Sequence, residues 1–123
     1  MLSERGFVAA LDALALRAPV PVDLVAVPDG PLSEPVEAAA YYVVAEALAN
    51  VHKHAGARRV AVSAAAEDGV LVVSVTDDGV GGADEEGSGL RGLADRVEAL
   101  GGELALESPA GGGTALRARI PLS

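Results

Sequence analysis

The chain has 123 residues, of which 50% are hydrophobic but only 2% aromatic, and its formal net charge is -9 at pH 7. This length fits one domain, with a core that must be built from Ala, Val and Leu. The acidic balance argues against a nucleic-acid partner held through phosphate contacts. It leaves a single nucleotide open, because a few local cations, main-chain amides and magnesium can hold one.

The composition also limits the cellular setting. The chain contains no cysteine, so disulfides are excluded and a reducing cytoplasm is the expected location. No apolar run reaches transmembrane length, and we expect no signal peptide at the start of the sequence.

Hydrophobic periodicity and turn residues predict eight elements. In chain order these are a helix at residues 7–17, a strand at 20–27, a helix from Ser33 to about His54, strands at 58–66 and 70–76, a helix at 90–100, and strands at 103–107 and 114–122. The order mixes hairpins with helical crossovers. It predicts a two-layer α/β sandwich, in which about three helices cover one face of a mixed sheet of about five strands and the other face is more exposed.

The long helix carries a polar stripe. Glu46, Asn50, Lys53 and His54 are spaced i, i+4, i+7 and i+8, which stacks them on one side. A carboxylate and an amide oxygen one turn apart can hold magnesium, and the two basic residues can meet phosphate oxygens. Taken alone, such a stripe is more often the solvated face of an amphipathic helix. His52 and His54 lack the further ligands that zinc requires.

A second block, Asp77-Asp78-Gly79-Val80-Gly81-Gly82, follows the strand at residues 70–76. At the end of a strand, Asp77 can accept a hydrogen bond from an exocyclic amine. Gly79 and Gly81 let a flat ring approach the main chain. Asp78 is interpreted as a solvated turn residue.

Two further glycine clusters follow. Gly87-Ser88-Gly89 precedes the helix at Leu90, where free main-chain amides and the helix dipole favour an anion. The cluster is neither a dinucleotide fingerprint, since no strand immediately precedes it, nor a P-loop, since it lacks Gly-Lys-Ser/Thr. The cluster at residues 111–114 would by itself be a hairpin turn.

Together the four blocks resemble the N, G1, G2 and G3 boxes of the GHKL ATPases, which include histidine kinases, gyrase-type ATPases, heat-shock chaperones and mismatch-repair ATPases and share the Bergerat fold. The closest similarity is to the catalytic ATP-binding domain of nitrate-sensor (NarX/DesK-like) histidine kinases. It rests on three runs: Glu46-x-x-x-Asn50-x-x-Lys53-His54-Ala55, Asp77-Asp78-Gly79-x-Gly81, and Gly87-x-Gly89-Leu90-x-Gly92-Leu93-x-Asp95-Arg96-Val97-x-x-Leu100-Gly101-Gly102. The resemblance covers about residues 19–122, and the Gly, Ala, Val and Arg richness fits a high-GC bacterium such as an actinobacterium.

The resemblance implies roles for the residues of the helical stripe. Asn50 would ligate magnesium, and Glu46 would orient a magnesium-bound water or help to activate transfer. Lys53 and His54 would contact the phosphates.

It also implies roles for the three glycine blocks. Asp77 would read the adenine amino group, and Thr114 would support Asp77 through its hydroxyl group or a water. The remaining nucleotide contacts would come from Gly79, Gly81, Gly87, Ser88, Gly89 and Leu90.

In this family the phosphate goes to a histidine on a separate dimerisation module. His52 and His54 are the only histidines of the chain, and both lie in the predicted long helix. We therefore expect one catalytic domain over residues 1–123, with residues 1–18 as the junction to that module. It would use ATP and Mg2+, act indirectly on a response regulator, be monomeric in isolation, and form the cytoplasmic portion of a membrane-bound kinase.

Two alternatives remain open within the resemblance. One is an anti-sigma-factor serine kinase of the same superfamily, which Lys53-His54 and the run Gly92-Leu93-x-Asp95-Arg96 disfavour. The other is a nucleotide-sensing interaction domain that binds ATP without transferring phosphate.

Overall fold

The computed structural model describes residues 4–18, 20–28, 32–53, 58–79, 88–107 and 113–122. These residues form, in chain order, α1 (Glu4–Arg17), β1 (Val22–Ala26), α2 (Glu34–Lys53), β2 (Val60–Glu67), β3 (Val70–Asp77), α3 (Ser88–Glu98), β4 (Glu103–Glu107) and β5 (Thr114–Pro121). The kind and the order of the predicted elements are confirmed. Only their ends differ, most at α1 and α3, which begin before the predicted positions.

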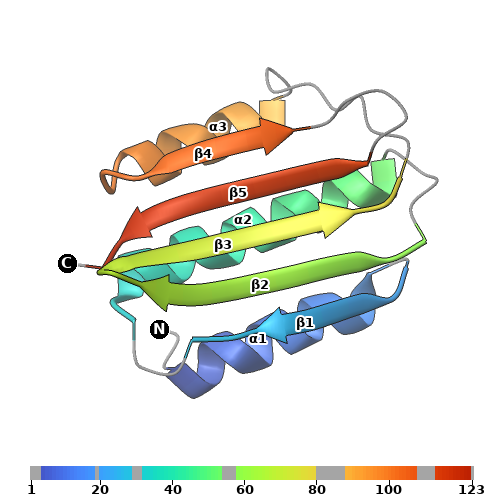
Figure 1. Cartoon of the computed structure of the whole chain (residues 1–123), viewed down its shortest axis with the longest axis horizontal. Helices are drawn as coiled ribbons and strands as arrows, with labels where there is room; N and C mark the ends of the chain where they lie inside the picture. The colour runs from blue at the N-terminus through green and yellow to red at the C-terminus, as the bar shows by residue number, and fades with distance from the viewer. Residues whose placement is uncertain are drawn as a thin grey trace.

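The strands form one sheet in the order β1-β2-β3-β5-β4. β1 runs parallel to β2, whereas β2 with β3, β3 with β5 and β4 with β5 are antiparallel. The parallel pair needs a crossover, which α2 supplies. All three helices lie on one face of the sheet (Figure 1), so the predicted two-layer α/β sandwich with a mixed sheet is confirmed.

The core lies between this face and the helices. At residues 60–65 of β2 and 70–75 of β3 the side chains alternate between buried and partly exposed, as expected for a sheet covered on one side. The buried hydrophobic residues described in α2 are aliphatic and mostly small: Val36, Ala39, Ala40, Val43, Val44, Ala47 and Leu48. Because these side chains are short, the helix packs closely on the sheet without large aromatic residues.

The first helix belongs to the same core. Phe7 and Leu11 are 0% and 1% exposed, and α1 packs against α2 and β1. On the opposite face of the sheet, Arg117 and Arg119 of β5 are exposed, as are Glu103 and Glu107 of β4. No helix in the described ranges is both long and apolar enough to cross a membrane.

The topology brings five segments to one end of the sheet. α2 and β3 end there, and β2, α3 and β5 begin there, at the right of Figure 1. The end of α2, Asp77 and the start of α3 are therefore parts of one region, although they are far apart in the sequence.

Glu37, in the first turn of α2, is a buried acid in this apolar layer. It is 1% exposed, and neither carboxylate oxygen has a hydrogen-bond partner among the described residues. Burial raises the pKa of Glu37, and the neighbouring Glu34 raises it further. Because the folded-state pKa lies above the unfolded-state value, the free energy of unfolding must fall as pH rises through this interval.

Glu37→Gln is therefore expected to raise the free energy of unfolding at pH 7, because it removes an acid that must ionise or hold a proton in an apolar site. The gain should shrink as pH falls below about 4.3, where the carboxyl group is protonated in both states. Urea denaturation at pH 7 and pH 4 measures both effects. Glu67→Gln, at an exposed position of β2, is the control; an equal gain at the two pH values would contradict the assignment to Glu37.

Candidate functional site

The site is built around the end of β3, the central strand of the sheet. Asp77, its last residue, lies opposite Val60 of β2 on one side and opposite Thr114 of β5 on the other. The second and fourth sequence blocks are therefore adjacent, although 36 residues separate Asp77 from Thr114. Pairing with both neighbours fixes the main chain at Asp77 on both sides.

The side chain of Asp77 shapes the turn that follows. It is partly buried, and its Oδ1 accepts the main-chain N–H of Gly79 at 2.8 Å. This local bond is an Asx turn, which directs the chain away from the sheet. The bond uses only one of the two carboxylate oxygens, Oδ1.

Gly113 presses on the main chain of Asp77 from the neighbouring strand. It is buried and has a φ of +79°, and a Cβ atom added to it would lie 2.4 Å from the carbonyl oxygen of Asp77. Any side chain there would push Asp77 out of position. The sequence indicated a glycine cluster at residues 111–114 but not this contact, since it depends on the pairing of β3 with β5.

Asp78 has a role in addition to the one expected. Its side chain is exposed, yet Oδ1 accepts the main-chain N–H groups of Arg58 at 2.7 Å and of Arg59 at 3.1 Å. These two bonds hold the pKa of Asp78 below its usual value. Asp78 is exposed, as predicted for a solvated turn residue, but its carboxylate also joins the turn to the start of β2, which the sequence did not indicate. Nothing in the local sequence identifies the partners, which lie 20 and 19 positions earlier.

The structure describes only some of the other predicted site residues. Glu46 is partly buried on α2, which continues through Asn50 to Lys53. Ser88, Gly89 and Leu90 form the first turn of α3, so this helix begins at Ser88, two residues before the predicted position. The side chains of Asn50, Lys53, Ser88 and Leu90, and the whole of His54, Gly81 and Gly87, lie outside the described part of the chain.

Packing sets the separation between α2 and α3. Leu93 and Val97 of α3 are buried, and the guanidinium carbon of Arg96 lies 4.2 Å from the ring centroid of Tyr42 on α2. Tyr41 meets Tyr42 edge to face, with ring centroids 5.8 Å apart. The cation–π contact and the apolar contacts hold the two helices side by side. They thereby fix the end of the polar stripe relative to the start of α3.

Comparison with known proteins agrees with this arrangement. Residues 36–123 match the family described as Histidine kinase-, DNA gyrase B-, and HSP90-like ATPase, and the chain belongs to this family. The match confirms the predicted class, an ATP-binding catalytic domain of the histidine-kinase type.

Relatives with similar sequences include a sensor protein and a histidine-protein kinase/phosphatase. The chain is 43% identical over 77 residues to the nitrate/nitrite sensor protein NarQ of Escherichia coli, covering 58% of this chain and 14% of that protein. It is 38% identical over 78 residues to the histidine-protein kinase/phosphatase UhpB of Salmonella typhimurium, covering 61% of this chain and 16% of that protein. The chain thus spans only a small part of the length of these relatives.

Solved structures share the fold. The histidine kinase domain of the blue-light activated kinase EL346 of Erythrobacter litoralis superposes with a TM-score of 0.79 at 24% identity, covering 97% of this chain and 64% of that one. Histidine kinase AdeS of Acinetobacter baumannii gives a TM-score of 0.75 at 15% identity, covering 99% of this chain and 66% of that one.

The contact between Gly113 and Asp77 makes a stability prediction. Gly113→Ala should destabilise the fold by about 1–3 kcal/mol, because alanine resists a positive φ and its Cβ would overlap the Asp77 carbonyl. Gly92→Ala is the matched control: Gly92 lies in α3 with nothing within 4 Å of an added Cβ, so alanine should stabilise by about 0.5–1 kcal/mol. Urea denaturation of both variants measures the difference. Equal stability of the two variants would show that the close approach at Gly113 has no energetic consequence.

Proposed function

We propose that the chain is the catalytic domain of a sensor kinase of the nitrate-sensor subfamily, from a high-GC actinobacterial source. It would transfer the γ-phosphoryl group of Mg-ATP to a histidine on a separate dimerisation module. The observation that carries the proposal is the convergence of the polar end of α2, Asp77, the start of α3 and Thr114 at one end of the sheet. The identity to a nitrate/nitrite sensor supports the subfamily.

The base would lie against the end of β3. Asp77 is held by pairing on both sides and by its bond to Gly79, and its Oδ2 would accept a hydrogen bond from the adenine amino group. Thr114, directly opposite, would support Asp77, and Gly79 and Gly81 would allow the ring to approach the main chain.

The phosphates would lie between the two helices. Lys53 and His54 would contact them from the end of α2, and Gly87, Ser88, Gly89 and Leu90 would do so from the start of α3. α3 has 11 residues, and Arg96 lies in its last turn. The first main-chain N–H groups of a helix have no partner within the helix, so they can donate hydrogen bonds to an anion, which the positive end of the helix dipole also attracts.

Asn50 and Glu46 offer oxygen donors, which are the ligands that magnesium prefers. When bound, this ion supplies charge neutralisation between the phosphates. The part of the protein itself is to orient the nucleotide and to hold the attacked phosphorus in reach of the acceptor histidine. Glu46 would orient a magnesium-bound water or help to activate the transfer.

The first helix would form the junction with the acceptor module. Phe7 and Leu11 are buried in the core, and α1 packs against α2 and β1. A movement of α1 would therefore displace α2 and β1. In the parent protein, residues 1–123 would act as one cytoplasmic domain of a membrane-bound sensor, and a response regulator would receive the phosphate in turn.

The proposed function predicts that the chain binds Mg-ATP but does not phosphorylate itself, because its two histidines lie in or beside α2 rather than on an acceptor module. Intact mass after long incubation with Mg-ATP should be unchanged. Adding the histidine-bearing module of the parent kinase should place label from γ-labelled ATP on that module. Stoichiometric phosphohistidine at His52 or His54 would contradict the assignment of the acceptor.

Asp77→Asn should test the assignment of the base. The amide keeps an oxygen for the Gly79 N–H but replaces the second acceptor by a donor, which cannot bind the adenine amino group. Losing a hydrogen bond to a charged group costs about 1.5–3 kcal/mol, or roughly ten- to a hundredfold in ATP affinity. Calorimetric titration measures the affinity, and circular dichroism controls for the fold. Equal affinity of the parent chain for ATP and GTP would contradict this role.

A further inference from the structure

The pairing of β2 with β3 ends at the site end of the sheet. The β2–β3 ladder ends with the pair of Val60 and Asp77. Arg58 and Arg59 precede this pair, and beyond it the Asx turn between Asp77 and Gly79 leads the chain away. The main-chain N–H groups of the two arginines therefore have no strand carbonyl opposite them and need another acceptor.

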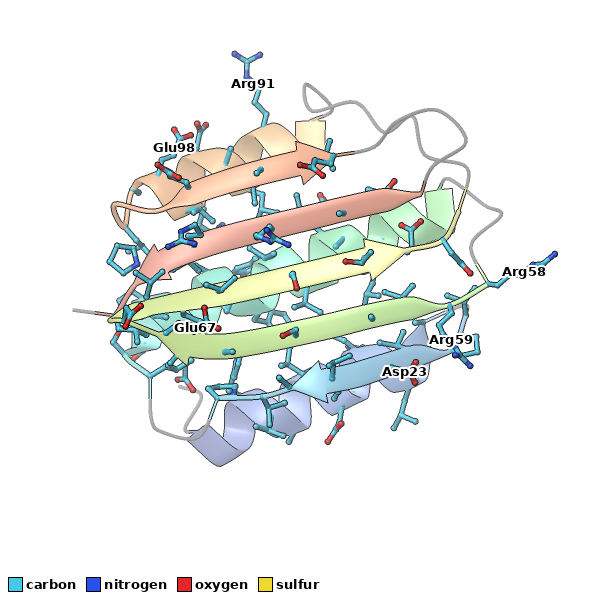
Figure 2. The ribbon with its side chains drawn as sticks, viewed as in Figure 1. Asp23, Arg58, Arg59, Glu67, Arg91 and Glu98 are labelled. Carbon is cyan, nitrogen blue, oxygen red and sulfur yellow. The ribbon has the colours of Figure 1, made fainter. Side chains whose placement is uncertain are left out.

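The side chain of Asp78 is that acceptor. A single oxygen, Oδ1, receives both N–H groups, at 2.7 and 3.1 Å, and thereby continues the connection between the strands past the end of the ladder. The side chain of Arg59 adds little to this link. It lies beside Asp23 (Figure 2), with the two charged groups 3.6 Å apart. The two side chains are 71% and 59% exposed, and exposed ion pairs contribute little.

The two segments joined in this way belong to different parts of the site. α2 ends at Lys53, and Arg58 and Arg59 are the first described residues after it. Asp78 adjoins Asp77, the residue assigned to the base. The bonds of Asp78 thus link the first described residues after α2 to the segment that carries Asp77.

We propose that Asp78 is a positioning residue of the nucleotide site, which holds the chain after α2 against the end of β3 through the N–H groups of Arg58 and Arg59. This inference rests on the proposed function, because it concerns the same nucleotide. In this role Asp78 would not touch the nucleotide; it would hold the segment that begins at Arg58 beside Asp77, the residue proposed to bind the base. Binding ATP in one well-defined pose depends on such fixed geometry.

If Asp78 is a positioning residue, the ATP affinity should depend on which side chain replaces it. Asp78→Ala removes the acceptor and should weaken ATP binding by about tenfold. Asp78→Asn keeps an acceptor oxygen in place and should stay within about threefold of the parent chain. Asp78→Glu keeps the charge but moves the oxygen by one methylene group, and should resemble the alanine variant. If Asp78 acted only by repelling the triphosphate, alanine and asparagine would both bind ATP more tightly than the parent chain.

Calorimetric titration with Mg-ATP and Mg-GTP, together with amide hydrogen exchange followed by NMR, tests the proposal. The amides of Arg58 and Arg59 should exchange faster in Asp78→Ala and Asp78→Glu than in the parent chain. The ratio of ATP to GTP affinity should fall in the same two variants, an effect that a general loss of stability would not produce. Asp23→Ala is the matched control, because Asp23 meets only the side chain of Arg59 and should leave both measurements unchanged.

Two outcomes would overturn the inference by itself: parental ATP affinity in folded Asp78→Ala, or unchanged exchange at both arginine amides. If the alanine variant does not fold, parental affinity in Asp78→Glu would overturn it equally. A parent chain that binds no ATP would overturn the proposed function as well, so the two failures are distinguishable.

Discussion

The structure depends on how the end of β3 is held. This strand lies in the middle of the sheet, and its last residue, Asp77, is paired on both sides. The close approach of Gly113 limits where its carbonyl group can lie, and the bond to Gly79 determines how the chain leaves the sheet. The proposed role of Asp77 in binding the base requires such a fixed main chain, because small displacements weaken directional hydrogen bonds.

Packing also holds the helices α2 and α3 in defined positions relative to the end of β3. α2 packs on the sheet through Ala and Val, and α3 is held against α2 by buried apolar residues and by the contact of Arg96 with Tyr42. The near absence of aromatic residues is part of this design, since short side chains keep the layers close together. In a dinucleotide-binding fold, a strand directly before the glycine cluster positions the helix that follows. In this chain, packing against α2 positions α3.

The acidic side chains have different functions at the two ends of the fold. At the site end, Asp77 and Asp78 accept main-chain N–H groups and so act as parts of the backbone framework. At the other end of α2, Glu37 is buried without a hydrogen-bond partner among the described residues, and burial raises its pKa. The net charge of -9 therefore says little about any one carboxylate; its surroundings decide whether it supports the fold or opposes it.

The sequence by itself determined the order of the elements, the two-layer architecture and the four blocks of the site. Each of these depends on local patterns: alternation in the strands, helical spacing from Glu46 to His54, and glycines at the turns. The junction role of residues 1–18 and the roles of the side chains in the polar stripe remain predictions from the sequence. Only the tertiary structure decided the bonds of Asp78 to Arg58 and Arg59, the contact of Gly113 with Asp77 and the burial of Glu37. The physical reason is that these features depend on strand pairing and helix packing between segments far apart in the chain, which a local pattern does not encode.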